Sequence, residues 1–207
     1  MRQLEMNEID ILVASSLGLG LAAASGFRVF IPPFLYGLFL RLDMVPISIP
    51  MTGISEWMAS DIGLIILGVA MIVEILGYYV PWIDNLLDTI ASPAAIIAGV
   101  MMMSSTLSDT HPALQWGASI IAGGGVSGTI QIGTVATRAV STATTGGLGN
   151  PIVSTVEAGA CIACTVLAIL LPFIAVILVV VLVGFSGRQV RKRLFTKNQN
   201  TIDSVRM

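Results

Sequence analysis

Long apolar segments with very few charges run through the sequence and limit its fold more than any other feature. About 20 consecutive apolar residues form a helix long enough to cross the hydrocarbon core of a membrane. Only 11% of the residues are charged, against roughly a quarter in water-soluble proteins, and the mean hydropathy is +0.91. The sequence therefore predicts an all-α, polytopic transmembrane helix bundle whose surface faces lipid.

We expect about five spans in this bundle. The first and last apolar segments are longer than one bilayer and contain Pro32-Pro33 and Pro172, so we expect them to be kinked or broken. If either segment folds back at its proline, the number of spans becomes four or six. The expected spans are Ile11–Leu40, Ile62–Val80, Pro93–Leu107, Trp116–Val140 and Ile152–Phe185.

A basic run, RQVRKRLFTK, follows the last apolar segment. Cytoplasmic flanks of membrane helices are rich in Lys and Arg, so this run predicts a basic cytoplasmic tail over residues 188–207. The remaining divisions are an N-terminal extracytoplasmic end over 1–10 and a single transmembrane helical domain over 11–187. The sequence thus predicts a multi-pass protein of the cell inner (plasma) membrane with its C-terminus in the cytoplasm.

Five spans also assign the short connections to sides of the membrane. With a cytoplasmic tail, Arg41 falls in a cytoplasmic loop, and the acids Asp84 and Asp88 fall at the outer interface or in an outer loop. Tyr78 and Tyr79 end the second span and are typical of the aromatic belt at a membrane surface.

Small residues recur at helical spacing in the first and fourth spans. Gly18, Ala22 and Gly26 lie four positions apart, and Gly124 and Gly128 form a GxxxG pair. Because lipid provides little hydrophobic drive between helices, such stripes favour close backbone packing, and we expect these two spans at the centre.

Four ionisable side chains interrupt the apolar spans: Arg28, Glu74, Arg138 and Glu157. A charge in the middle of a bilayer costs about 2.5–3.5 kcal/mol on insertion scales, so these groups need partners or a function. Three explanations stay open. The charged groups can form a path or site for an ion, a proton or an anionic solute; they can act as a clamp that fixes helix packing; or they can reach the membrane interface by snorkelling.

These residues also suggest a weak internal repeat. Each half of the chain has a small-residue helix with an arginine, followed by a helix with a glutamate. Inverted repeats of this kind build many transporters. We expect the four charged residues, together with Gln131 and Asn150, to form a polar binding site.

Other functional classes find little support in the sequence. The net charge of -2 gives no reason to expect nucleic acid, and Cys161 and Cys164 lie in an apolar helix, where small hydrophobic packing is the expected role. Met101-Met102-Met103 and the single His111 do not form a metal site, because neighbouring helical side chains diverge and one imidazole is too few ligands. We expect no cofactor, no metal and no enzyme activity.

Motifs in order along the chain resemble those of the small bacterial membrane proteins grouped as "domain of unknown function 4126". The first helix of that family reads G-F-R-x-F-x-P, which Gly26, Phe27, Arg28, Phe30 and Pro32 match. The second region is matched by Glu74, Pro81, Asp84 and Asp88, and the last region by Asn150, Pro151, Ser154 and Glu157.

The chain also departs from the pattern of this family. Tyr78 and Tyr79 stand where an Asp-Lys pair occurs, Ala158 replaces an acid, and Gln131 and Thr134 replace a His and a Lys, while Arg138 is kept. The resemblance implies a helical membrane protein with a reduced polar network and implies no particular activity.

Together these observations favour a transporter- or channel-like protein whose buried arginines and glutamates hold a small polar or anionic solute or an ion. The alternative is a membrane scaffold or complex subunit that transports nothing and whose ion pairs fix helix packing. The expected partners are the lipid bilayer and the solute, with a homo-oligomer or a membrane complex left open.

Overall fold

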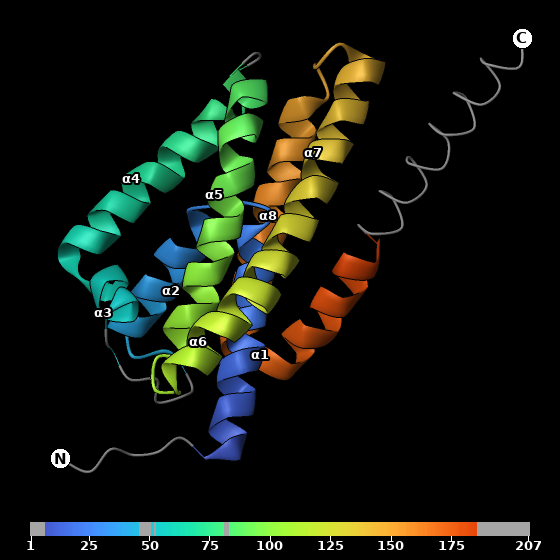
Figure 1. Ribbon diagram of the computed structural model, residues 1–207. Helices are drawn as coiled ribbons and strands as arrows, with labels where there is room; N and C mark the ends of the chain where they lie inside the picture. Colours follow the sequence, from blue (N-terminus) through green and yellow to red (C-terminus); the bar gives the residue numbers. More distant parts are fainter. Residues whose placement is uncertain (1–6, 46–50, 52, 81–82, 186–207) are drawn as a thin grey trace, which may run out of the picture.

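The structure is a computed structural model that describes residues 7–45, 51, 53–80 and 83–185. The predicted tail over 188–207 and most of the predicted extracytoplasmic segment over 1–10 therefore lie outside the described residues. The described part contains helices and no strands, which confirms the all-α prediction (Figure 1). The helices are α1 Glu8–Ser25, α2 Ile31–Arg41, α3 Ile54–Ala59, α4 Asp61–Gly77, α5 Ile83–Thr106, α6 Pro112–Ala118, a π-helix Ser119–Gly124, α7 Gly125–Thr145, α8 Asn150–Leu170 and a final helix Pro172–Phe185.

By length and composition, four helices of the described chain could cross a membrane, which confirms a bundle of the predicted class. They are Glu8–Ser25, Leu86–Thr106, Pro112–Thr145 and Asn150–Leu170. The expected third span was too short, because α5 begins ten residues before Pro93 and continues through it. The helical stretch at the expected fourth span is longer at both ends than predicted, because α6, the π-helix and α7 together form one 34-residue stretch.

The first apolar segment folds back and does not form one kinked span. α1 ends at Ser25, and α2 starts at Ile31 with the two prolines in its first turn, where their missing N–H groups cost nothing. Tyr36 and Leu40 of α2 lie in the same hydrophobic cluster as Leu17 of α1, which agrees with α2 folding back toward the start of the chain.

The last apolar segment also folds back. α8 ends at Leu170, and the final helix returns beside it from Pro172, so that Phe185 lines the same groove as Ile152 (Figure 1). Proline cannot continue the hydrogen-bond ladder of α8, which gives the physical reason for the break.

Because both long segments fold back, the connections between helices lie at other ends of the bundle than five single spans would give. Figure 1 shows α3, α6 and the start of α1 toward one end of the bundle, here called the N-terminal end, and the end of α4, the start of α5 and the α7–α8 connection at the opposite end. Arg41 pairs with Asp61 at the start of α4 and so lies toward the N-terminal end. Five single spans would put Arg41 and the start of α1 at opposite ends of the bundle. The structure instead follows the alternative that the prediction left open, in which both long segments fold back at their prolines.

Close helix packing relies on the small residues. A Cβ added at Gly26 would lie 2.6 Å from the carbonyl oxygen of Ser127, and one added at Gly99 would lie 2.7 Å from that of Gly123. Ser127 also donates its hydroxyl to the carbonyl oxygen of Ala95. These contacts hold α7 and the π-helix against α1 and α5.

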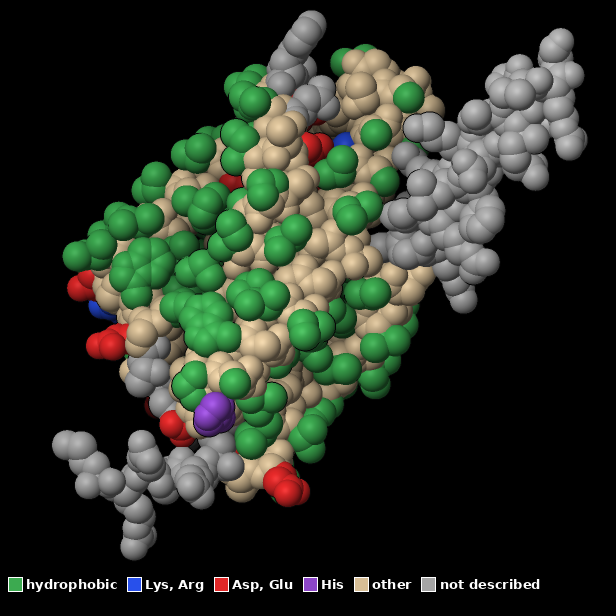
Figure 2. All heavy atoms as spheres, in the orientation of Figure 1, with side chains coloured by type: hydrophobic (Ala, Val, Ile, Leu, Met, Phe, Trp, Pro, Cys, Tyr) green, Lys and Arg blue, Asp and Glu red, His purple; other side chains and the backbone are tan. Residues whose placement is uncertain are grey.

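The outer surface is apolar. Figure 2 shows hydrophobic side chains over most of the visible face, with charged groups mainly toward the ends. On α4 alone, Ile62, Ile65, Ile66, Val69, Ile72, Val73 and Leu76 are exposed. An exposed face of this composition suits a lipid environment.

Candidate functional site

The break between α1 and α2 places Arg28 inside the bundle. Its side chain is buried, with 1% of the residue exposed. Nη2 donates to the carbonyl oxygen of Ser154 at 3.0 Å and to its hydroxyl oxygen at 2.6 Å. Arg28 therefore joins the broken first segment to the start of α8.

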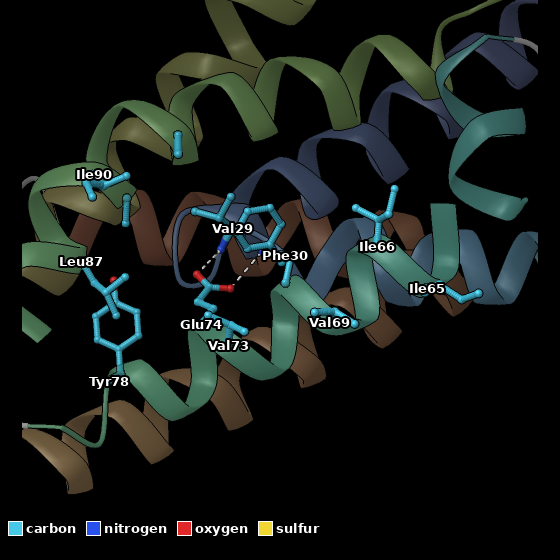
Figure 3. Close-up of a pocket in the computed structure, with 13 residues that line it drawn as sticks. Val29, Phe30, Ile65, Ile66, Val69, Val73, Glu74, Tyr78, Leu87 and Ile90 are labelled. Atoms are coloured by element: carbon cyan, nitrogen blue, oxygen red, sulfur yellow. Dashed lines mark hydrogen bonds between the residues drawn. The ribbon is translucent and has the colours of Figure 1, made fainter. Parts of the chain in front are cut away.

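Glu74 of α4 binds the backbone of the break itself, just before α2. Its carboxylate accepts the backbone N–H groups of Val29 at 2.8 Å and Phe30 at 3.0 Å, which Figure 3 shows as dashed lines. Both N–H groups lie in the break, where no helical carbonyl group pairs with them, and a buried backbone N–H needs an acceptor. Glu74 thus has a structural reason to be in the membrane.

Arg138 of α7 is the most fully bonded group of the site. Nε donates to Oε2 of Glu157 at 3.0 Å, Nη2 donates to the same oxygen, and Nη1 donates to Oδ1 of Asp88 at 2.6 Å. All three nitrogen atoms of Arg138 therefore have carboxylate partners, and the side chain ties α5, α7 and α8 together.

Tyr78 lies between the two arginines. The Cζ atoms of Arg28 and Arg138 are each 3.8 Å from the centroid of its ring. Two guanidinium groups cannot share one face of a ring at this distance, so they stack on opposite faces, where the ring quadrupole attracts them. Tyr78 is buried and does not belong to an aromatic belt, which corrects the prediction.

These contacts define one connected site, here called the arginine cluster. Its members are Arg28, Glu74, Tyr78, Asp88, Arg138 and Glu157. The two guanidinium groups also meet through one carboxylate, because Nη2 of Arg28 lies 3.6 Å from Oε2 of Glu157. All four charged residues predicted from the spans thus lie together, close to the end of the bundle opposite the N-terminal end.

Not every polar atom of the cluster has a partner. Nε and Nη1 of Arg28 and Oε1 of Glu157 are buried and make no hydrogen bond within the described chain. Buried polar groups are nearly always hydrogen-bonded in folded proteins, so these three atoms need an explanation. They mark the place where the cluster can accept a further group.

The two acids predicted at the outer interface or in an outer loop lie in a helix and not in a loop. Asp84 and Asp88 lie in the first turns of α5, and Asp84 is only 4% exposed. The prediction placed them outside because it started the third span at Pro93. Since Asp88 pairs with Arg138, it belongs to the arginine cluster.

Asn150 forms a second polar group beside the cluster. Its Nδ2 donates to Oδ2 of Asp84 at 2.6 Å and to the hydroxyl of Thr142 at 3.0 Å, while its Oδ1 is buried and has no partner in the part of the chain that the structure describes. Gln131 is buried on α7 but shares no hydrogen bond with the arginine cluster. The predicted site is therefore split, and Gln131 stands apart from it.

Two grooves border the arginine cluster. The first has a volume of about 490 Å³, lies between α4 and α5, and includes Glu74 and Tyr78 in an otherwise apolar lining (Figure 3). The second has a volume of about 330 Å³ and lies between α7, α8 and the final helix, with Glu157 in its lining. Arg28 lines neither groove, so the cluster is closed at that residue.

The two cysteines are free and buried. The thiol of Cys161 donates to the carbonyl oxygen of Ala24 at 3.2 Å and thereby helps hold α8 against α1. This packing role agrees with the one expected from the sequence.

The comparison with protein families agrees with the motifs seen in the sequence. The family described as "Domain of unknown function (DUF4126)" matches residues 16–192, which is most of the chain. The chain belongs to this family. All six members of the arginine cluster lie within the DUF4126 match, and no curated protein and no solved structure matched the chain.

Proposed function

We propose that this DUF4126 protein is transporter- or channel-like and that Arg28 binds a small polar or anionic solute or an ion. The proposal rests on the unused hydrogen-bonding capacity of Arg28, whose Nε and Nη1 are buried and have no acceptor among the described residues. An unmet buried donor costs about 1–3 kcal/mol, more when it is charged. A solute that supplies acceptor atoms removes this cost, which is the basis for binding.

The two arginines then have different roles. Each of the three nitrogen atoms of Arg138 already donates to a carboxylate, so its role in the proposal is to position Glu157 and Asp88. Arg28 uses only Nη2, on Ser154 and toward Glu157. Arg28 is the solute-binding residue in this proposal, and Arg138 is the clamp.

The break before α2 places Arg28 at an interruption between two helices. Interrupted helices near an intramembrane charge are the places where transporters expose polar groups to a solute. Arg28 is closed on all sides by protein in this arrangement, so the helices around the break must move before a solute reaches it. The proposal also includes location in the inner (plasma) membrane with the tail in the cytoplasm.

Flux into vesicles tests the proposal. The purified full chain is reconstituted in liposomes, and uptake of chloride, phosphate, bicarbonate, urea and glycerol is compared with uptake by protein-free vesicles. We expect flux of at least one of them, reduced at least tenfold by Arg28→Met and unchanged by Arg41→Met, whose side chain is half exposed at the N-terminal end. Absence of flux for every probe, or equal flux for both variants, contradicts the proposal.

A scaffold is the second candidate, and it is favoured by Arg138, each of whose nitrogen atoms donates to a carboxylate. A closed ion pair can fix helix register without binding anything. In a scaffold, Arg28→Met and Arg138→Met both lower stability and no variant changes flux, because there is none. The same reconstitution with thermal unfolding of each variant therefore separates the two candidates.

A further inference from the structure

The groove between α7, α8 and the final helix combines an apolar wall with polar atoms that can only accept hydrogen bonds. Its apolar lining includes Phe27, Ile130, Val153, Val156, Leu182 and Phe185. Its polar lining consists of Thr134, Thr137 and Glu157 side chains, beside the backbone of Gly133. Glu157 is the one ionisable residue in this lining among the residues that the structure describes.

The hydroxyl groups of the two threonines are already used as donors. Thr134 donates to the carbonyl oxygen of Gln131, and Thr137 donates to that of Gly133, both at 2.9 Å. Each hydroxyl oxygen keeps acceptor capacity and has no proton left for a ligand. These two groups therefore favour a ligand that donates.

Glu157 adds a third acceptor. Its Oε2 receives Arg138, but its Oε1 is buried and accepts no hydrogen bond from the described chain. Within the arginine cluster, three carboxylates face two guanidinium groups, so the ionised cluster carries a surplus negative charge. Both facts favour a positively charged donor.

We infer that this groove binds an amphiphilic amine from the membrane, with its ammonium group toward Glu157 and its apolar body along the wall. A volume of about 330 Å³ holds a small amphiphile of this kind. The ammonium donates to Oε1 of Glu157 and to the hydroxyl oxygens of Thr134 and Thr137. This site does not require that the protein transports anything, and it differs from the solute site at Arg28.

Binding of three matched probes tests this inference. The full chain is placed in lipid nanodiscs, and 2-phenylethylamine, 2-phenylethanol and phenylacetate are titrated by calorimetry, with empty nanodiscs as the reference for partitioning into lipid. The three probes share an aromatic body and differ in the head group. We expect saturable binding of the amine, at least tenfold weaker binding of the alcohol and none of the carboxylate.

Two variants locate the site without touching the ion pairs. Thr134→Val keeps the side-chain shape and removes an acceptor, so we expect amine binding to weaken about tenfold. Val156→Trp fills the groove and abolishes binding, whereas Ile162→Trp, also exposed on α8 but outside the groove lining, leaves binding unchanged. Equal binding of all three probes, or amine binding that survives both Thr134→Val and Val156→Trp, overturns the inference.

Discussion

Arg28 and Ser154 lie 126 positions apart in the sequence, yet Nη2 of Arg28 donates to both the carbonyl and the hydroxyl oxygen of Ser154. This contact is possible because Arg28 lies in the break between the end of α1 and the start of α2. A charged side chain thus reaches the first turns of α8 across the centre of the bundle.

The first prediction concerns that contact. Ser154→Ala removes the hydroxyl that accepts from the buried guanidinium, so we expect the free energy of unfolding to fall by about 1–3 kcal/mol. The measurement is thermal or chemical unfolding in detergent. Thr144→Ala is the control, because Thr144 is exposed and bonds only to its own helix. An equal effect of the two variants contradicts the role given to Ser154.

The second prediction concerns the clamp. Arg138→Met leaves Glu157 and Asp88 without their cation, and breaking a buried ion pair costs about 3–5 kcal/mol. We therefore expect a large loss of stability, measured by the unfolding midpoint in the same detergent.

Two comparisons make this prediction specific. Arg138→Lys is not expected to rescue stability, since one ammonium group cannot reproduce the planar fork that reaches both acids and stacks on Tyr78. Arg41→Met should cost about 1 kcal/mol or less, because its pair with Asp61 is exposed. A clamp variant as stable as Arg41→Met would show that the cluster does not hold the helices.

The third prediction concerns helix contact. A Cβ at Gly26 would collide with Ser127 and Ile130 of α7, so Gly26→Ala should destabilise by about 1–3 kcal/mol. Gly125→Ala has nothing within 4 Å of the added atom and should be neutral or raise stability by about 1 kcal/mol, since alanine favours a helix. If the order of the two variants in an unfolding experiment is reversed, the packing of α1 on α7 is wrong.

Some of this fold follows from the sequence and some does not. Apolar length and low charge are enough to predict the helical bundle, and the cost of a buried charge is enough to predict that Arg28, Glu74, Arg138 and Glu157 need partners. The returns at Pro32-Pro33 and Pro172 could not be predicted, because proline permits a kink or a reversal and tertiary packing decides between them.

The membership of Tyr78 and Asp88 in the arginine cluster was not predicted from the sequence. A tyrosine near the end of an apolar segment is typical of a membrane surface, and its burial between two guanidinium groups depends on contacts from α1 and α7 that are distant in the chain. Asp88 looked like a loop acid because α5 starts earlier than its apolar part. Its spacing one helical turn after Asp84 was the signal that both belong to a helix.

The fourth prediction concerns the sides of the membrane. Because α2 returns along α1, single cysteines at Glu8→Cys and Glu56→Cys should react with an impermeant thiol reagent from the same side, and Leu148→Cys from the opposite side. Five single spans predict that positions 8 and 56 label from opposite sides. The wild-type chain is the control, since Cys161 and Cys164 are buried and should stay unlabelled.

The most direct test of the solute site is an experimental structure in lipid, resolved well enough to show groups around the Arg28 side chain. We predict a bound water, ion or solute within hydrogen-bonding distance of Nε or Nη1 of Arg28, the two nitrogen atoms of this side chain that have no partner in the described part of the protein. A guanidinium surrounded only by protein atoms that satisfy all of its donors, or one that points outward to the acyl chains, would contradict a binding role for Arg28.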